Sequence, residues 1–444
     1  MDQAFLDYYR CPDSPSYFRL SDGVSTGNPP GYFRFGSNLI CYGPAAIQTR
    51  DSATGPLIDG LPQVRVEGAT CVLPFNPTQI ADNLRYERYV NRAPAKSWKQ
   101  VVRNSYYWVR PALPVPLRRH LQRIWLNGWE HRPFPRWPVD CTVDEIFSTL
   151  MRLALEASGE DRIPFIWFWP EGKSACAIMT HDVETAAGLE FTGRLMDIND
   201  SFSVKSSFQI IPQARYAATE DVLSRIRHRG FEINVHDLLH DGHLYDSHEQ
   251  FLRSAVRINE WASRFGSTGF RSGVLYRNLE WYSAFRFAYD MSVPNVGHLD
   301  PQSGGCCTVM PYFVGDILEL PVTTIQDYSL FHILGSYSLD LWREQIRRIM
   351  ERHGLISFIV HPDYLNTPES VRTYTDLLDY LRRLREEASL WTALPAEVDR
   401  WWRQRSKMRL VCEADSWRIT GPGAERARIA YAMLRNNELS YSLN

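Results

Sequence analysis

Residues 175–184 read Ala-Cys-Ala-Ile-Met-Thr-His-Asp-Val-Glu, an apolar run that leads directly into an acidic cluster. The run predicts a buried β-strand, because it is short, continuous and apolar. Asp182 and Glu184 would then emerge at the carboxyl end of that strand, where α/β sheets and barrels carry their chemistry. The stretch therefore predicts an α/β fold with a functional site at one edge of its sheet.

A second strand of this kind is predicted at 231–235, and it ends at His236, four residues before His240. Two imidazoles and the carboxylate of Glu184 would form a divalent-metal site with three protein ligands and a position left for water. Asp182 could take the proton of that water, so the pattern predicts hydrolysis. One divalent ion is expected as cofactor, with Zn²⁺ favoured and Co²⁺, Ni²⁺ or Mn²⁺ as alternatives.

Two further predicted strands end in polar groups that suit such a site. Arg271 follows residues 267–270, and its guanidinium group could hold a carboxylate such as Asp182 ionised and oriented. The alternative for this arginine is a structural ion pair. His361 ends the β-prone run 354–360 and is a candidate general acid, because imidazole titrates near neutral pH. The alternative for this histidine is a strand cap.

Together these segments resemble the polysaccharide deacetylases (carbohydrate esterase family 4, the NodB-homology domain). The resemblance covers about 165–405 and rests on the order and spacing of four motifs: Thr180-His-Asp-Val-Glu184, His236 to His240, Phe270-Arg-Ser-Gly273 and Ile359-Val-His-Pro362. The first motif looks like an Asp-x-Asp/Glu variant, and the third has Ser272-Gly273 where the family has a proline. The resemblance implies a distorted (β/α) barrel of the polysaccharide deacetylase type.

The resemblance also implies a role for each candidate residue. The family's functional residues correspond here to the base Asp182, the arginine Arg271 that steadies it, the acid His361, and the metal ligands Glu184, His236 and His240. The commoner first motif has two adjacent aspartates, whereas here Val183 follows Asp182 and the acid comes one residue later. His181 is the alternative ligand if Glu184 does not bind the metal.

The implied reaction removes an N-acetyl group from an amino sugar in a polysaccharide, an oligosaccharide or a glycoconjugate precursor. Two alternatives stay open. The same site could hydrolyse another linear C–N bond, as the allantoinase-like relatives of the family do, and acetate release would separate the two reactions. The third interpretation is a saccharide-binding or scaffold protein that has lost activity, and the unusual position of Glu184 keeps it open.

Composition narrows the class of protein and its partners. The 49 basic and 51 acidic residues give no electrostatic case for nucleic acid or an anionic membrane. The eight cysteines have no Cys-x-x-Cys spacing, residues 1–10 do not show a secretory-signal pattern, and no run has the length of a membrane helix. The sequence therefore predicts a cytoplasmic protein without membrane insertion, and the resemblance implies that its substrate is an N-acetylated saccharide.

At 444 residues the chain is long enough for two or three domains. Three segments are predicted: an N-terminal α+β accessory domain at 1–165, the barrel at 166–405, and a small β-rich C-terminal segment at 406–444. In the N-terminal segment, β-prone runs at 63–67 and 70–74 precede helical patterns at 79–92 and 143–157. In the C-terminal segment, strands are predicted at 416–420, 427–431 and 439–443.

Two local signals lie within the predicted barrel. The sequence Ser-His-Glu-Gln at 247–250 is a capping box that would open a helix, and Gly266 would end that helix. The glycine-rich stretch 295–305 predicts a loop over the substrate groove, in which His298 is a candidate for substrate contact.

Overall fold

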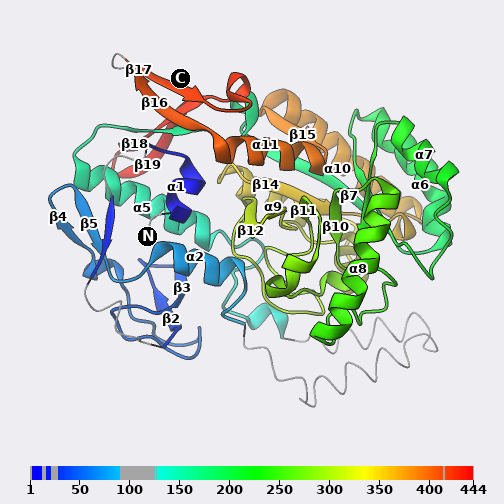
Figure 1. Cartoon of the computed structure of the whole chain (residues 1–444), viewed down its shortest axis with the longest axis horizontal. Helices are drawn as coiled ribbons and strands as arrows, with labels where there is room; N and C mark the ends of the chain where they lie inside the picture. The colour runs from blue at the N-terminus through cyan, green and yellow to red at the C-terminus, as the bar shows by residue number, and fades with distance from the viewer. Residues whose placement is uncertain are drawn as a thin grey trace.

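The computed structural model of the chain describes residues 3–12, 17–21, 29–90, 126, 128–413 and 416–443. Its largest element is a nine-stranded sheet, seen among the helices in the right-hand half of Figure 1. The strands are β7 (Ala175–Val183), β8 (Ser207–Ile210), β9 (Glu232–His236), β10 (Gly269–Arg271), β11 (Tyr289–Asp290), β12 (Tyr312–Val314), β13 (Ile317–Glu319), β14 (Leu355–Ile359) and β15 (Leu390–Ala393). They follow the order β12-β13-β11-β10-β9-β8-β7-β14, and β15 pairs with the first half of β7.

The helices of this part of the chain are α6 (Ala186–Ser201), α7 (Glu220–His228), α8 (His248–Phe265), α9 (Asp340–Met350), α10 (Pro368–Glu387) and α11 (Pro395–Lys407). Strands and α-helices alternate from β7 to β10 and again from α9 to α11, whereas β10, β11, β12 and β13 follow one another without an α-helix. Every strand pairing in the sheet is parallel except β12 with β13, and parallel neighbours require crossover connections. The predicted distorted (β/α) barrel, with its N-terminal α+β and C-terminal β-rich additions, is confirmed.

The barrel closes irregularly on the side between β13 and β14. Within the described residues these two strands are not paired. Instead, Thr323 Oγ1 donates a hydrogen bond to the carbonyl of Leu355 (2.7 Å), and Thr324 Oγ1 donates to that of Ser357 (2.8 Å). The segment after β13 is thereby held against β14, which brings the two ends of the sheet together.

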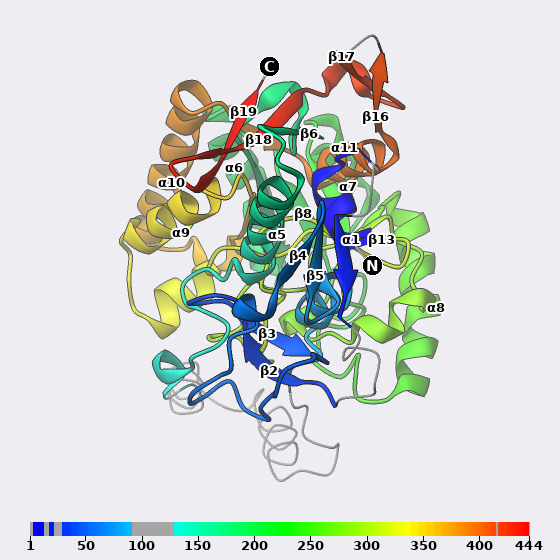
Figure 2. The same cartoon turned by 90° about the vertical axis from the view of Figure 1, so that its left-hand side faces the viewer.

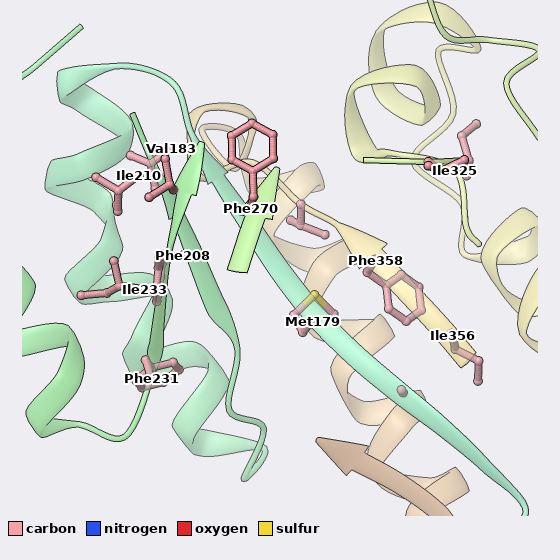
Figure 3. Packing of buried hydrophobic residues seen from close by; sticks show 14 of the residues in the cluster. Met179, Val183, Phe208, Ile210, Phe231, Ile233, Phe270, Ile325, Ile356 and Phe358 are labelled. Atoms are coloured by element: carbon pink, nitrogen blue, oxygen red, sulfur yellow. The ribbon is translucent and has the colours of Figure 1, made fainter. Parts of the chain in front are cut away.

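Alternate residues of each barrel strand face opposite ways, and this alternation positions the site. In β7, Met179 and Val183 belong to the apolar cluster between the sheet and helices α6 to α10, some of whose members are shown in Figure 3. Ile178 belongs to a second cluster on the inner face. Because side chains alternate along a strand, Thr180 and Asp182 share the inner face with Ile178.

Helix α8 begins and ends where the sequence predicts. Ser247 Oγ accepts a hydrogen bond from the backbone N–H of Gln250 (3.2 Å), and Gly266 ends the helix in the left-handed conformation, with φ of 57°. The side chain of Gln250 donates to the carbonyl of His243 (3.0 Å), so only half of the predicted capping box forms. A cap of this kind stabilises a helix by about 1 kcal/mol.

The N-terminal and C-terminal parts of the chain lie together on the side that faces the viewer in Figure 2. Their helices are α1 (Gln3–Tyr9), α2 (Pro77–Arg85) and α5 (Thr142–Ser158), and their strands are β1 (Phe18–Leu20), β2 (Gly31–Arg34), β3 (Ile40–Gly43), β4 (Arg65–Glu67), β5 (Thr70–Leu73), β6 (Ile163–Ile166), β16 (Arg409–Glu413), β17 (Ser416–Thr420), β18 (Ile429–Arg435) and β19 (Glu438–Leu443). The predicted strands are present, but α2 ends at Arg85, whereas the predicted helical pattern continues to 92; its last two positions lie outside the described residues. The predicted elements did not include helix α1 or strands β1, β2, β3, β6 and β16.

The C-terminal strands are joined to the N-terminal side of the barrel. Strand β18 pairs antiparallel with β6, so that Ala430 lies opposite Phe165. The hydroxyl groups of Tyr9 and Tyr441 are 2.6 Å apart and share a hydrogen bond. One apolar cluster runs through both parts and into the inner face of the barrel. The predicted division at residues 165 and 405 stays a prediction. Within the described residues, no helix combines the length and the apolar character that a membrane crossing needs.

Candidate metal and catalytic site

The three predicted metal ligands lie together at the carboxyl ends of two barrel strands. Glu184 directly follows β7, His236 ends β9, and His240 lies in the loop after β9. Glu184 Oε1 is 3.0 Å from His240 Nε2. One potential ligand atom from each of the three residues lies within 4.8 Å of the other two. The structure therefore brings together a cluster that is compact enough to hold one ion.

The two imidazoles of this cluster have the chemistry that a metal ligand needs. His236 Nδ1 lies 3.1 Å from the carbonyl oxygen of Arg271; a carbonyl only accepts, so Nδ1 carries the proton and Nε2 keeps its lone pair. Burial lowers the pKa of His236 to about 4, which keeps the ring neutral. His236 Nε2 is buried without a hydrogen-bond partner among the described residues, and His240 Nε2 faces the carboxylate of Glu184. The residues present thus fit a divalent ion.

Asp182 lies on the same face, between an arginine and the ligand cluster. Arg271 Nη1 donates to Asp182 Oδ1 (2.9 Å) and to Thr180 Oγ1 (2.7 Å), and Arg271 Nε donates to the carbonyl of Met291 (2.9 Å). Asp182 Oδ2 is 3.7 Å from His236 Nε2. Burial would raise the pKa of Asp182, but the charge of Arg271, with smaller contributions from His236 and His361, lowers it overall. The carboxylate is therefore ionised and oriented, as a general base must be.

His361 approaches the cluster from the opposite side and is paired with Asp327. His361 Nδ1 donates to Asp327 Oδ1 (2.6 Å), and the backbone N–H of His361 donates to Asp327 Oδ2 (2.7 Å). His361 Nε2 is 3.8 Å from Glu184 Oε1. Burial would lower the pKa of His361, but Asp327 raises it to about 10. The imidazolium is therefore the stable form near neutral pH, with its Nε2 proton directed at the site.

Several residues that support this arrangement were missed in the sequence. Asp327 was missed because it lies in an irregular segment after β13, outside any motif. Tyr364 Oη donates to Glu184 Oε2 (3.4 Å), and Asp363 accepts from the backbone N–H of Glu184 (3.1 Å). Arg215 Nη2 donates to the carbonyl of His240 (2.6 Å). Only Asp363 had a usable signal, because it follows the fourth motif by one residue.

His181, the alternative ligand, lies on the other face of β7. Its Nδ1 donates to the carbonyl of Val360 (2.9 Å), and its Nε2 accepts from the side-chain amide of Asn199 (3.0 Å). Burial lowers its pKa to about 4, so the ring is neutral and both nitrogens are engaged. The prediction that His181 could replace Glu184 is wrong, because His181 points toward α6 and α10 rather than into the cluster.

The unusual third motif has a local explanation. A β-carbon placed on Gly273 would lie 2.5 Å from Asp237 Oδ2 and 3.1 Å from His240 Cδ2. The first distance is too short for a side chain unless Asp237 moves, and the second is tight, so glycine at position 273 lets the segment after Arg271 lie close to Asp237 and the His240 ring. The Ser272-Gly273 sequence therefore lets this segment pack directly on a candidate ligand.

A narrow cavity lies beside the segment that carries Asp327. Its lining includes Trp137, Leu275, Asp300 and Gln326. Gln326 Nε2 donates to Asp300 Oδ1 (2.8 Å), and Gln326 directly precedes Asp327 in the chain. The predicted loop 295–305 therefore reaches the neighbourhood of the candidate acid through Asp300.

We expect Asp300→Asn to stabilise the protein at pH 8 and to leave its stability unchanged at pH 4. Burial raises the pKa of Asp300 to about 6, above the value of about 4 in an unfolded chain. The folded state therefore binds the proton of Asp300 more tightly than the unfolded state does. This difference stabilises the folded protein fully below about pH 4, and the stabilisation is lost as the pH rises through 6. Asparagine keeps the acceptor for Gln326 but does not ionise. Urea unfolding at pH 8 should show a gain of ~2 kcal/mol, and equal stabilities there would contradict the prediction.

Comparison with known proteins gives likenesses to solved structures only. No protein-family model and no curated protein sequence matches the chain. A Mycobacterium smegmatis protein assigned to the polysaccharide deacetylases is similar at 20% identity over 54% of this chain and 93% of that one, with a TM-score of 0.43. The allantoinase PuuE is similar at 13% identity over 53% and 92%, with a TM-score of 0.42. Peptidoglycan deacetylase PdaC of Bacillus subtilis is similar at 14% identity over 52% and 93%, with a TM-score of 0.31. The likeness concerns the fold alone.

Proposed function

We propose that this protein is a metal-dependent hydrolase that removes N-acetyl groups from an amino sugar in a polysaccharide, an oligosaccharide or a glycoconjugate precursor. One observation carries the proposal. A carboxylate base and an imidazolium acid flank a compact cluster of three ligand-type residues, with Asp182 next to His236 and His361 next to Glu184. A base, an acid and metal ligands in this arrangement are the components of metal-assisted amide hydrolysis.

The metal would be held by Glu184, His236 and His240, with Zn²⁺ favoured. When bound, a divalent ion would polarise the acetamide carbonyl and lower the pKa of a water molecule. Asp182 accepts the proton of the attacking water, and Arg271 keeps that carboxylate in place. These residues account for formation of the new C–O bond.

His361 accounts for cleavage of the C–N bond. An amine anion is a very poor leaving group, so the nitrogen must be protonated as the bond breaks. The Nε2 proton of His361 is available for this step, because Asp327 holds the Nδ1 side of the ring (2.6 Å) and favours the charged form. The products are acetate and a free amino sugar.

Metal content is the first test, because it needs no knowledge of the substrate. The purified protein is expected to hold about one divalent ion per chain, and His240→Ala to lose it. His228→Ala is a matched control, since His228 is exposed at the end of α7. Elemental analysis of the three proteins, with circular dichroism to verify folding, gives the result. If the wild-type protein binds no zinc, cobalt or manganese, the proposed mechanism is wrong, and a saccharide-binding or scaffold role is favoured instead.

Acetate release then identifies the reaction. A set of N-acetylated saccharides, incubated with the metal-loaded protein, should yield acetate and a free amine in equal amounts. A metal-loaded protein that releases no acetate but cleaves another linear C–N bond would instead be an amidohydrolase of the allantoinase-like kind.

A further inference from the structure

A second and larger cavity lies where the N-terminal part meets the loop that contains His298. It has a volume of about 490 Å³, which lies within the range of roughly 300–1,000 Å³ that is usual for ligand pockets. Its lining includes Tyr32 of β2, Tyr42 of β3, Tyr89, Phe134 and His298. None of these residues belongs to the site described above.

Aromatic rings in this cavity are fixed in place. The Tyr32 and Tyr42 rings have centroids 4.9 Å apart, and those of Tyr89 and Phe134 are 5.0 Å apart. The hydroxyl of Tyr32 donates to the carbonyl of Tyr89 (2.8 Å), and the hydroxyl of Tyr89 donates to that of Gly305 (2.7 Å). Rigid aromatic rings suit a sugar, because their apolar faces can stack against the C–H face of a pyranose.

The cavity also carries a positive charge that has no counter-ion in the part of the chain that the structure describes. Arg132 lines it and is partly buried, and burial lowers its pKa with no described carboxylate to offset this effect. The other two charged residues of the lining, Arg88 and Asp51, are exposed and of opposite sign. His298 adds an Nε2 atom that is buried without a hydrogen-bond partner among the described residues. Partly buried charges usually have a partner, so the net charge of this lining favours an anionic ligand.

Contacts link this cavity to the catalytic acid. The rings of His298 and Trp137 have centroids 6.0 Å apart. Trp137 lines the narrow cavity together with Gln326, and the next residue, Asp327, holds His361. A chain of side-chain contacts therefore runs from the larger cavity, through Trp137 and Gln326, to the residue that holds the candidate acid.

We propose that this cavity binds an anionic sugar residue of the substrate, with Arg132 as the counter-ion of its carboxylate or phosphate group, while another residue of the same saccharide presents its acetamido group to the site. The assignment of the bound sugar to the substrate rests on the proposed deacetylase function. Arg132 is in this view a specificity-determining residue, and neutral saccharides are the poorer substrates.

Calorimetric titration of the full chain with three sugars that have no acetamido group tests this proposal. The probes are trigalacturonate, glucose 6-phosphate and maltotriose. At least one anionic probe is expected to bind at millimolar concentration, with maltotriose about tenfold weaker or worse, and Arg132→Gln should weaken the anionic probe by about tenfold. Binding of trigalacturonate alone would indicate a carboxylate, and binding of glucose 6-phosphate alone would indicate a phosphate.

Arg418→Gln is the matched control, because Arg418 is an exposed arginine of β17 that pairs with Glu413, outside the cavity lining. It should bind the probes as the wild type does. Failure of both anionic probes, or equal affinity in Arg132→Gln, would overturn the proposal. Since none of the probes can release acetate, such a failure would leave the metal and acetate tests of the proposed function standing. Conversely, if the protein binds the anionic probe through Arg132 but releases acetate from no saccharide, the proposed deacetylase function is wrong and the anion site stands.

Discussion

Asp182→Asn is expected to lower kcat/KM for acetate release by about 10³-fold or more, while the variant keeps its metal and its fold. A general base contributes roughly 10²–10⁴ to such a rate, and asparagine cannot accept the proton of the attacking water. The amide keeps an oxygen that can accept from Arg271 Nη1, which now donates to Asp182 Oδ1 (2.9 Å). Because Asp182 is not one of the three clustered ligand residues, metal content should stay near that of the wild type.

Initial-rate measurements on any saccharide that yields acetate would give kcat/KM for the wild type and for Asp182→Asn. Asp221→Asn offers a matched control, since Asp221 is exposed in the first turn of α7. A variant that retained more than a tenth of wild-type kcat/KM would show that another group accepts the proton. A variant that lost its metal as well would show that Asp182 is a ligand instead of the base.

The inner-face residues of the site could be predicted because strand periodicity and chemistry agree. Asp182 and Glu184 are two positions apart and so fall on one face, and His236 ends a strand of the same apolar kind. The same alternation argues against His181, which shares the face of Met179 and Val183. Because side chains alternate along β7, His181 faces away from Asp182, and this alternation alone rules out His181 as a metal ligand.

Other features depend on contacts that no local pattern encodes. Asp327 meets His361 across 34 positions of the chain, from an irregular segment whose place is set by the Thr323 and Thr324 hydrogen bonds to β14. The pairing of β18 with β6 likewise requires a partner far away in the sequence. Strands and helices follow from periodicity and caps, whereas the partners of loop residues follow only from the assembled fold.

Glu87→Ala is expected to lower the free energy of unfolding by about 3–5 kcal/mol, because it leaves an unpaired charge in the interior. Glu87 and Arg277 form an ion pair in which neither side chain is exposed. Arg277 Nε donates to Glu87 Oε2 (2.8 Å), and the backbone N–H of Gly305 donates to Glu87 Oε1 (2.6 Å). Glu87, which lies two residues after the end of α2, therefore connects this part of the chain to the loops of the barrel that contain Arg277 and Gly305.

Urea unfolding followed by circular dichroism measures this loss. Glu249→Ala is the control, since the Glu249–Arg253 pair on α8 is exposed, and its removal should cost less than ~0.5 kcal/mol. Replacing both Glu87 and Arg277 by methionine should recover much of the stability, because no charge is then buried alone. A loss below ~1 kcal/mol in Glu87→Ala would mean that water or another group satisfies Arg277.

The pairing of β6 with β18 has a consequence for biosynthesis. Residues 163–166 acquire their antiparallel neighbour only when residues 429–432 have been made. At roughly 5–20 residues per second, the ribosome needs some tens of seconds to supply that neighbour. During this interval one edge of β6 lacks the strand that covers it in the finished fold, and such an edge is a site for mispairing with other chains. Expression yield should therefore depend on the speed of translation and on chaperone supply, and versions of the chain that stop before residue 429 should aggregate.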